Sequence, residues 1–424
     1  MISPVSLDEG VVEPEITPTE RRKAFATHAG VLARAAGLPA AAYRARDLAL
    51  PPSIVLHADT DALAVFVGDG EDGPTIDSAL AYGIAQSAAR SLSLVLPQGA
   101  ETATAIRAAF VNHPPRLWTH LEGTVAKVSI PSQGDALRVM AGGEIWPGIC
   151  HLRDRKPWVA ALEAWADNHP RLQHAHRQGY RAWVCDGLMV LRIQRSRDGL
   201  LITTGGGCSR PIGKQRAADR WSITAPLSST DFDAIRSRVS AGVTDRLAVD
   251  DSSYGEQLVQ AALVRHAREV GWSGSEPIRD FPVIRPGGEA GLIDLLWLDD
   301  DACLHIVTTR VDTDDLMVLQ GLDHWIWASA NRAPLAQFLG VSDIAAIKLD
   351  FIVAEPNGNH PMPHVRVLSP QVPAQLEALG PDIDWEIHRL SCWATSTPVL
   401  TAFGSRTVPD GAHADRRPPR PAQP

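Results

Sequence analysis

The sequence predicts a multidomain protein of mixed α/β and α+β class. A β-α-β pattern near 63–96 and two Asp-Gly turns between β-rich runs near 181–204 support this prediction. A helix, three strands, a helix and a strand follow after residue 251. The length of 424 residues is typical of two or three domains. We therefore expect a small α/β domain in 1–150, an α+β region with a β-meander in 151–250, a third α/β domain in 251–400 and a disordered tail in 401–424.

The composition is that of a globular protein with a sizeable core. Hydrophobic residues make up 45% of the chain and charged residues 21%. No apolar run approaches the roughly 18–20 residues that a membrane span needs. The acidic start of the chain lacks the basic and apolar segments of a signal peptide. These features predict a cytoplasmic protein with no membrane partner.

Charge and cysteine content restrict the classes of ligand. The net charge of −9 argues against a dedicated high-affinity DNA binder, although it leaves a local basic groove open. No C-x-x-C pair occurs, so the sequence favours reduced thiols over a zinc site or a disulfide framework. The cysteines are Cys150, Cys185, Cys208, Cys303 and Cys392.

The first domain is predicted from alternating strand and helix patterns. A helix within 20–37 precedes strand 63–67, helix 75–90, strand 92–96, helix 101–110 and strand 116–119. The glycine-rich turn 68–73 is similar to a phosphate-binding loop. Its carboxylates, Asp69, Glu71 and Asp72, would repel a phosphate, so we interpret it as a solvated turn.

The middle region is predicted to contain three antiparallel strands joined at Asp186-Gly187 and Asp198-Gly199. Asp-Gly favours hairpins because type I′ turns need positive φ at both central residues. The meander carries Arg181, Arg192, Arg195 and Arg197, and a loop with several histidines precedes it. Two interpretations stay open: a surface that faces nucleic acid, or the polar face of a one-sided sheet. The histidines lack a recognised metal-ligand spacing.

The third domain begins with an amphipathic helix near 252–270, on which Glu256 and Gln260 share one face. Three strands and a helix follow, and Thr313 or Asp314 is the expected cap of that helix. A closing strand completes the order. The expected strands are 280–284, 291–298, 303–309 and 345–355, and the second helix is 313–331.

Asp294 is a lone carboxylate in the apolar run "GLIDLLWL". Its neighbours predict a strand covered on both faces, where an ionised carboxylate is costly unless a cation or metal pairs with it. On the returning strand, Thr308 and Arg310 share one face and Thr309 points to the other. A hairpin could place that face beside Asp294 and Glu256. Two such carboxylates could bind a divalent metal.

The last third of the chain resembles the PD-(D/E)XK superfamily, the restriction-endonuclease-like nucleases. The stretches "EQLVQ", "GLIDLL", "VTTR" and "DDLMVLQGLDHW" are similar to motifs of its bacterial members, and the last is the most specific. The resemblance implies a restriction-endonuclease-like α/β core and nucleic acid as partner. It also implies Glu256 and Asp294 as metal-binding acids, with Mg²⁺ or Mn²⁺ as cofactor in an active enzyme, and Gln320 as a supporting residue.

Three positions depart from the family pattern. Thr308 replaces the second metal-binding acid, Arg310 the catalytic lysine and His324 a tyrosine. Threonine carries no charge, and arginine cannot shuttle protons as lysine does. The candidate catalytic positions are Glu256, Asp294, Thr308, Arg310, Gln320 and His324. We expect a degenerate active site with no cofactor, in which Arg310 pairs directly with Asp294 and Glu256.

Three functions follow as hypotheses, and whether the protein is an enzyme stays open among them. The first is a nuclease-fold protein with a decayed metal site that binds nucleic acid or a protein partner. The second is an active deoxyribonuclease that uses Mg²⁺ or Mn²⁺, with groups relocated to Lys348 or to the acidic turn 299–301, in restriction or phage defence. The third is a structural interaction protein.

Overall fold

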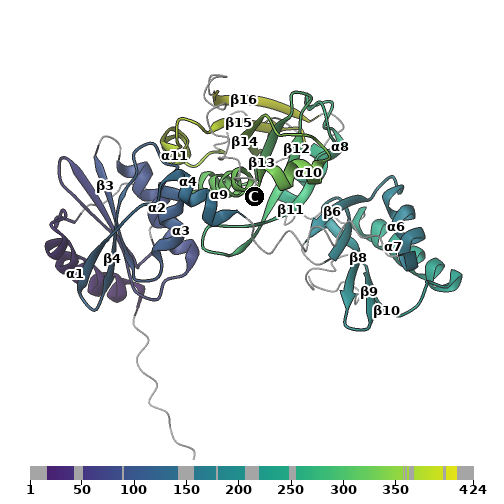
Figure 1. Cartoon of the computed structure of the whole chain (residues 1–424), viewed down its shortest axis with the longest axis horizontal. Coiled ribbons are helices and arrows are strands. Elements are labelled where there is room, and N and C mark those ends of the chain that lie inside the picture. The colour runs from purple at the N-terminus through teal and green to yellow at the C-terminus, as the bar shows by residue number, and fades with distance from the viewer. Residues whose placement is uncertain are drawn as a thin grey trace, which may run out of the picture. The chain divides into compact units, whose positions relative to one another are not determined.

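The computed structural model shows a mixed α/β protein that divides into two compact units (Figure 1). Unit 1 comprises 1–101 and 115–129, and unit 2 comprises 102–114 and 130–424. The middle and C-terminal regions, which the sequence separates at 250, therefore group together in unit 2. The structure describes residues 17–42, 51–87, 90–141, 157–177, 180–205, 219–247, 255–356, 358, 361, 367–394 and 398–407.

Unit 1 is built on a sheet of five strands in the order β1-β2-β3-β4-β5. Helix α2 connects the parallel strands β2 and β3, so the predicted β-α-β arrangement is confirmed. The outer strands β1 and β5 pair antiparallel to their neighbours, and neither strand was predicted from the sequence. The elements are α1 (Pro18–Ala36), β1 (Ile54–Ala58), β2 (Ala62–Val67), α2 (Gly73–Ser87), β3 (Ser91–Pro97), β4 (Arg116–Leu121) and β5 (Thr124–Val128).

Local sequence explains the ends of the unit 1 helices. Thr17 and Glu20 form a capping box at the start of α1, and Gly37 ends that helix with a φ of 64°. In the glycine-rich turn, the Asp72 carboxylate accepts a hydrogen bond from the Thr75 backbone N–H at 3.0 Å. An acidic side chain thus occupies the start of α2, where a phosphate would otherwise bind.

Unit 2 contains an 11-stranded sheet in the order β10-β9-β8-β7-β6-β11-β12-β13-β14-β15-β16. Its strands are β6 (Gln173–Arg177), β7 (Tyr180–Cys185), β8 (Leu188–Ser196), β9 (Gly199–Thr204), β10 (Asp219–Ile223), β11 (Ile278–Ile284), β12 (Ala290–Leu298), β13 (Cys303–Arg310), β14 (Ala346–Ala354), β15 (Asp384–Ser391) and β16 (Val399–Arg406). Its helices are α3 (Glu101–Ala108), α4 (Gln133–Met140), η1 (Pro157–Val159), α6 (Ala160–Asp167), α7 (Ser229–Leu247), α8 (Gly255–Arg265), α9 (Met317–Ala330), α10 (Arg332–Leu339) and α11 (Val372–Ala378).

The strands β6 to β10 form the meander. Asp186 and Gly187 have φ of 43° and 82°, so the first predicted Asp-Gly turn is confirmed. The second turn lies one residue earlier than predicted, because Gly199 already pairs with Ser196 in the ladder. Part of the histidine-containing segment predicted as a loop, Gln173–Arg177, is strand β6.

Strand β13 lies at the centre of the segment that contains the candidate site. It pairs antiparallel with β12 and parallel with β14. The consecutive β14 residues Phe351 and Ile352 point to opposite faces of the sheet. Ile352 packs in one cluster with Val259 of α8, and the Phe351 ring lies against Gly321 of α9. The two helices therefore cover opposite faces, and the predicted order of helix, three strands, helix and strand is present, with α10 inserted before β14.

The end of the chain differs from the prediction of a disordered tail from residue 401. Strand β16 continues to Arg406 because it pairs with β15. Residues 408–424 lie outside the described part of the chain. Every helix in the described ranges is too short or too polar to cross a bilayer.

Gly321 offers a test of the packing between α9 and the sheet. A Cβ atom at this position would lie 2.6 Å from the Phe351 ring. We expect Gly321→Ala to lower the free energy of unfolding by about 1–3 kcal/mol, because a buried ring must move. Urea unfolding measures the effect. Gly134→Ala in α4 is the matched control, since a Cβ there meets nothing within 4 Å; equal stability of the two variants would contradict the expectation.

Candidate functional site

The Asp294 carboxylate lies where β12 and β13 separate. The ladder between these strands ends at the Leu295–Val307 pair. Asp294 Oδ2 accepts hydrogen bonds from the Thr309 backbone N–H at 2.7 Å and from the Thr309 hydroxyl at 3.1 Å. The carboxylate thus satisfies an amide at the end of the sheet, and its side chain is 20% exposed.

The Arg310 guanidinium fills the space beside Asp294. Its Nη1 lies 3.4 Å from Asp294 Oδ2, its Nε donates to Asp314 Oδ2 at 2.6 Å, and its Nη2 donates to the side-chain oxygen of Gln320 on α9. Glu256 Oε1, at the start of α8, is 3.8 Å from Nε. The structure therefore contains the predicted pairing of Arg310 with Asp294 and Glu256. One cation contacts three carboxylates, and its side chain is only 13% exposed.

Burial dominates the electrostatics of these groups. It raises the pKa of Asp294 and of Glu256 above their ordinary values, and the positive charge of Arg310 opposes both shifts. Burial would lower the pKa of Arg310, but Asp294, Asp314 and Glu256 outweigh it and leave that pKa above its usual value. Arg310 is thus permanently charged, whereas Asp294 and Glu256 take up protons more readily than free carboxylic acids.

A buried chain of polar side chains supports Asp294 from the α8 side of the sheet. Gln260 donates from Nε2 to the Thr309 hydroxyl at 3.1 Å, and Arg279 donates from Nη2 to Gln260 Oε1 at 2.9 Å. Arg279 is 1% exposed and also donates to Gln173 Oε1. Arg279 was not predicted from the sequence, because Asp280 follows it directly and the two opposite charges make it look like an ordinary polar strand end.

One expectation about the site is incomplete and another is wrong. Arg310, which shares a face with Thr308, contacts Asp294 as expected. The shortest contacts, however, come from Thr309 on the other face, because the carboxylate binds the backbone amide at the point where the strands part. The Thr308 hydroxyl is buried and has no hydrogen-bond partner among the described residues. Asp314 is not the cap of the second helix, which begins at Met317 after Leu316. Instead, Asp314 pairs with Arg310 and accepts a hydrogen bond from the Leu316 N–H.

His324 is buried in α9, and its Nδ1 atom has no hydrogen-bond partner among the described residues. Burial lowers its pKa to about 4. Its neighbour Asp323 is fully buried and receives two hydrogen bonds from Arg107 of α3 and one from Arg285. These paired charges link α3, α9 and the loop after β11, which is a structural role that the sequence alone did not indicate.

The groups considered for relocated catalysis lie at the opposite end of β13. Lys348 is in register with His305, five residues before Arg310 along the strand, which corresponds to about 16 Å. Its Nζ lies 2.5 Å from Glu386 Oε2 and 3.7 Å from Asp350 Oδ1. Asp299 of the acidic turn contacts His305 at the same end. Neither group lies close enough to Asp294 to replace the missing acid or lysine.

No protein-family model matches the chain, and no curated protein or solved structure is significantly similar to it. The resemblance to the PD-(D/E)XK superfamily therefore depends on the motif residues of the sequence alone.

His324 makes stability depend on pH. Its pKa is 6.5 in an ordinary environment and about 4 in the folded protein, so the unfolded chain binds more protons between these values. Stability is therefore lost as the pH falls from 6.5 to 4, by about 2 kcal/mol at pH 5. His324→Phe should remove this loss. Urea unfolding at pH 5 and 8 measures it, with His113→Gln, at an exposed position, as the control. An unchanged pH dependence in His324→Phe would contradict the expectation.

Proposed function

We propose that the segment from α8 to β15 is a restriction-endonuclease-like domain whose metal site has decayed, and that the protein binds nucleic acid or a protein partner rather than cutting DNA. The observation that carries this proposal is the position of the Arg310 guanidinium between Asp294, Glu256 and Asp314. A fixed organic cation occupies the place between carboxylates where the family motif implies a metal ion.

The topology around the site supports the choice of family. Helix α8 precedes three antiparallel strands, helix α9 follows on the opposite face, and β14 lies parallel to β13. The motif residues converge at one end of this arrangement: Glu256 begins α8, Asp294 is on β12, Arg310 ends β13 and Gln320 is on α9. This convergence of four motifs supports the proposal more than any one motif does.

The chemistry of Arg310 argues against efficient cleavage. Mg²⁺ and Mn²⁺ act by binding phosphate oxygens and a water that they acidify. A guanidinium can bind a phosphate but supplies no such water, and its raised pKa prevents it from accepting a proton. Thr308 is neutral and 1% exposed, so it does not compensate for the missing acid. The alternative, an active nuclease with relocated groups, would need Lys348 or Asp299 to act over about 16 Å.

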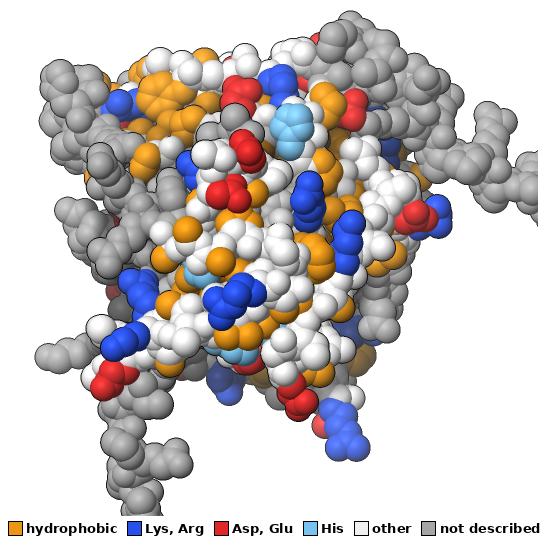
Figure 2. All heavy atoms as spheres, turned by 90° about the vertical axis from the view of Figure 1, so that its left-hand side faces the viewer, with side chains coloured by type: hydrophobic (Ala, Val, Ile, Leu, Met, Phe, Trp, Pro, Cys, Tyr) orange, Lys and Arg blue, Asp and Glu red, His pale blue; other side chains and the backbone are white. Residues whose placement is uncertain are grey.

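The surface limits how nucleic acid would bind. Over unit 1, the face in Figure 2 shows basic side chains scattered among acidic and apolar ones, with no continuous basic surface among the described residues. In the meander, Arg181 pairs with Glu163 at 2.8 Å and Arg192 lies over the Tyr180 ring. Arg195 and Arg197 near the β8–β9 turn are exposed. Any phosphate contacts would therefore be few and sensitive to salt.

Removing Arg310 should allow a metal ion to bind between the carboxylates that Arg310 now contacts. Arg310→Ala leaves three carboxylates without their shared cation, and we expect a loss of about 3–5 kcal/mol in stability. Millimolar Mn²⁺ should restore part of this loss by occupying the vacated position, and it should not stabilise the wild-type protein. Thermal unfolding with and without Mn²⁺ measures both effects.

Arg389→Ala is the matched control for this experiment. Arg389 has the same 13% exposure and pairs with Glu355 at 2.6 Å. Its removal should also destabilise unit 2, but Mn²⁺ should give no rescue, because Glu355 offers one carboxylate where Arg310→Ala leaves three. Stabilisation of the wild-type protein by Mn²⁺, to the extent seen in Arg310→Ala, would show that the metal site is intact and would refute the proposed decay.

A nuclease assay separates the three candidate functions. Plasmid and linear DNA should stay uncut in Mg²⁺ and in Mn²⁺, while binding of labelled DNA should appear at low salt and weaken steeply as salt increases. Cutting that disappears in Asp294→Ala would instead establish an active nuclease. A chain that neither cuts DNA nor binds it at low salt would leave protein partners as its ligands.

A further inference from the structure

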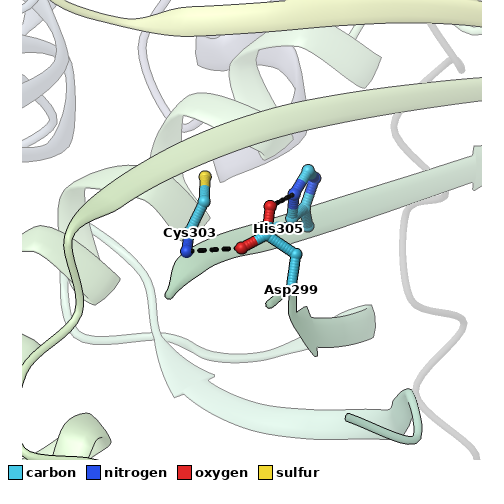
Figure 3. A group of neighbouring side chains, drawn as sticks. All are labelled: Asp299, Cys303 and His305. Atoms are coloured by element: carbon cyan, nitrogen blue, oxygen red, sulfur yellow. Dashed lines mark hydrogen bonds and ion pairs between the residues drawn. The ribbon is translucent and has the colours of Figure 1, made fainter. Parts of the chain in front are cut away.

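A second group of chemically reactive side chains lies at the amino end of β13, remote from Arg310. Asp299 belongs to the turn between β12 and β13, and Cys303 and His305 are the first and third residues of β13. Residues two apart on a strand point to the same face. Figure 3 shows the Asp299 carboxylate between the other two residues. The turn and the strand thus bring a carboxylate, a thiol and an imidazole together within seven residues of sequence.

The spacing of the three ligand atoms suits a metal ion. The carboxylate oxygen, Sγ and ring nitrogen all lie within 4.8 Å of one another, and His305 Nε2 is 3.2 Å from Asp299 Oδ2. Ligands of a tetrahedral zinc ion lie about 3.3–3.8 Å apart at ordinary bond lengths. The carboxylate oxygen and the ring nitrogen already have this spacing, and Sγ needs an adjustment of about 1.5 Å at most. Zinc accepts sulfur, imidazole and carboxylate ligands together.

The structure orients the imidazole as metal-binding histidines are usually oriented. His305 Nδ1 is 2.5 Å from Asp350 Oδ2 on the neighbouring strand, which leaves Nε2 directed toward Asp299. A carboxylate on the far nitrogen is the common outer partner of a zinc-bound histidine. The ring also stacks on Trp297 at 3.9 Å between centroids, and Trp297 stacks on Trp272. These contacts hold the ring before any ion binds.

The hydrogen-bond pattern at His305 calls for a cation at Nε2. A neutral imidazole donates from one nitrogen only, yet a carboxylate faces each ring nitrogen. The second carboxylate is satisfied either by a second proton on the ring or by a metal ion shared with Nε2. Either cation satisfies the pattern. The nearby Cys303 thiol would add a third ligand to a metal ion, because thiolate is among the strongest zinc ligands.

The adjoining group of Asp350, Glu386 and His388 is a weaker candidate for a metal. The Lys348 ammonium already lies 2.5 Å from Glu386 and 3.7 Å from Asp350. This lysine compensates the carboxylates of β14 and β15, whereas Asp299 contacts no cation other than His305 among the described ion pairs. Asp299 is therefore the carboxylate with fewer cations around it.

We propose that Asp299, Cys303 and His305 bind one divalent ion of the zinc class through Oδ2, Sγ and Nε2, with Asp350 holding the histidine and solvent in the fourth position. Binding displaces the thiol proton and any proton on Nε2 to solvent. The site is independent of the proposed nuclease-like function, because His305 lies about 16 Å along β13 from Arg310.

Titration of the full-length, metal-stripped protein with Co²⁺ tests the proposal. We expect one equivalent to bind with the visible bands of tetrahedral cobalt and a near-ultraviolet thiolate-to-cobalt band, and Zn²⁺ should displace it. Cys303→Ser should remove the thiolate band. Asp299→Asn should lose most of the affinity, although its Oδ1 can still accept the turn hydrogen bonds from Asp301 and Cys303. Asp350→Asn should weaken binding by about 10–100-fold.

Two control variants identify the ligands. Asp300→Asn changes an exposed acid in the same turn, and Cys392→Ser changes a cysteine outside the site; both should bind cobalt as the wild-type protein does. Circular dichroism verifies that each variant is folded. A folded wild-type protein that binds no Co²⁺ with a thiolate band would overturn the proposal. A thiolate band that persists in Cys303→Ser, or an affinity that Asp350→Asn leaves unchanged, would overturn it as well.

Discussion

A guanidinium at the carboxyl end of β13 neutralises carboxylates that the fold has partly withdrawn from water. Four elements meet there: β12 brings Asp294, the start of α8 brings Glu256, the loop before α9 brings Asp314, and β13 brings Arg310 itself. A buried ion pair of this kind adds little net stability over an apolar substitute, but loss of one partner leaves uncompensated charge. The pairing therefore specifies how these elements converge more than it stabilises them.

The sequence predicted this interaction because the two charges stand out against their surroundings. Asp294 is flanked by leucine and isoleucine, and Arg310 closes an apolar strand, so each needs a partner and the hairpin brings them together. The strand order and the β-α-β unit followed from similar periodic patterns. Strand β6 was not predicted, because its sequence is rich in polar residues and histidine and lacks the apolar alternation of a strand. It forms a strand mainly because it pairs with β7 and β11.

Other details of the site could not be read from periodicity. The bond from the Thr309 amide to Asp294 exists because the ladder stops at Leu295, and where two strands separate is decided by tertiary packing. Asp314 resembles a helix cap in sequence, but its carboxylate pairs with Arg310, four residues earlier. The helix begins later, at Met317. The group of Asp299, Cys303 and His305 was not predicted, because it contains no pair of cysteines with a metal-ligand spacing. A turn, a strand and the neighbouring Asp350 bring its side chains together.

Carboxylates cluster at both ends of β13, and their negative charge is neutralised differently at each end. At the carboxyl end, a covalently attached cation satisfies the acids, so the charge is present in every molecule and cannot be exchanged for an ion that carries a reactive water. At the amino end, the His305 imidazole lies between Asp299 and Asp350, Lys348 contacts only Asp350 of these two, and the Cys303 thiol lies beside Asp299. An exchangeable ion can bind there without displacing a side chain. A metal ion therefore fits the start of β13 better than the position that the nuclease motif implies, where Arg310 already lies.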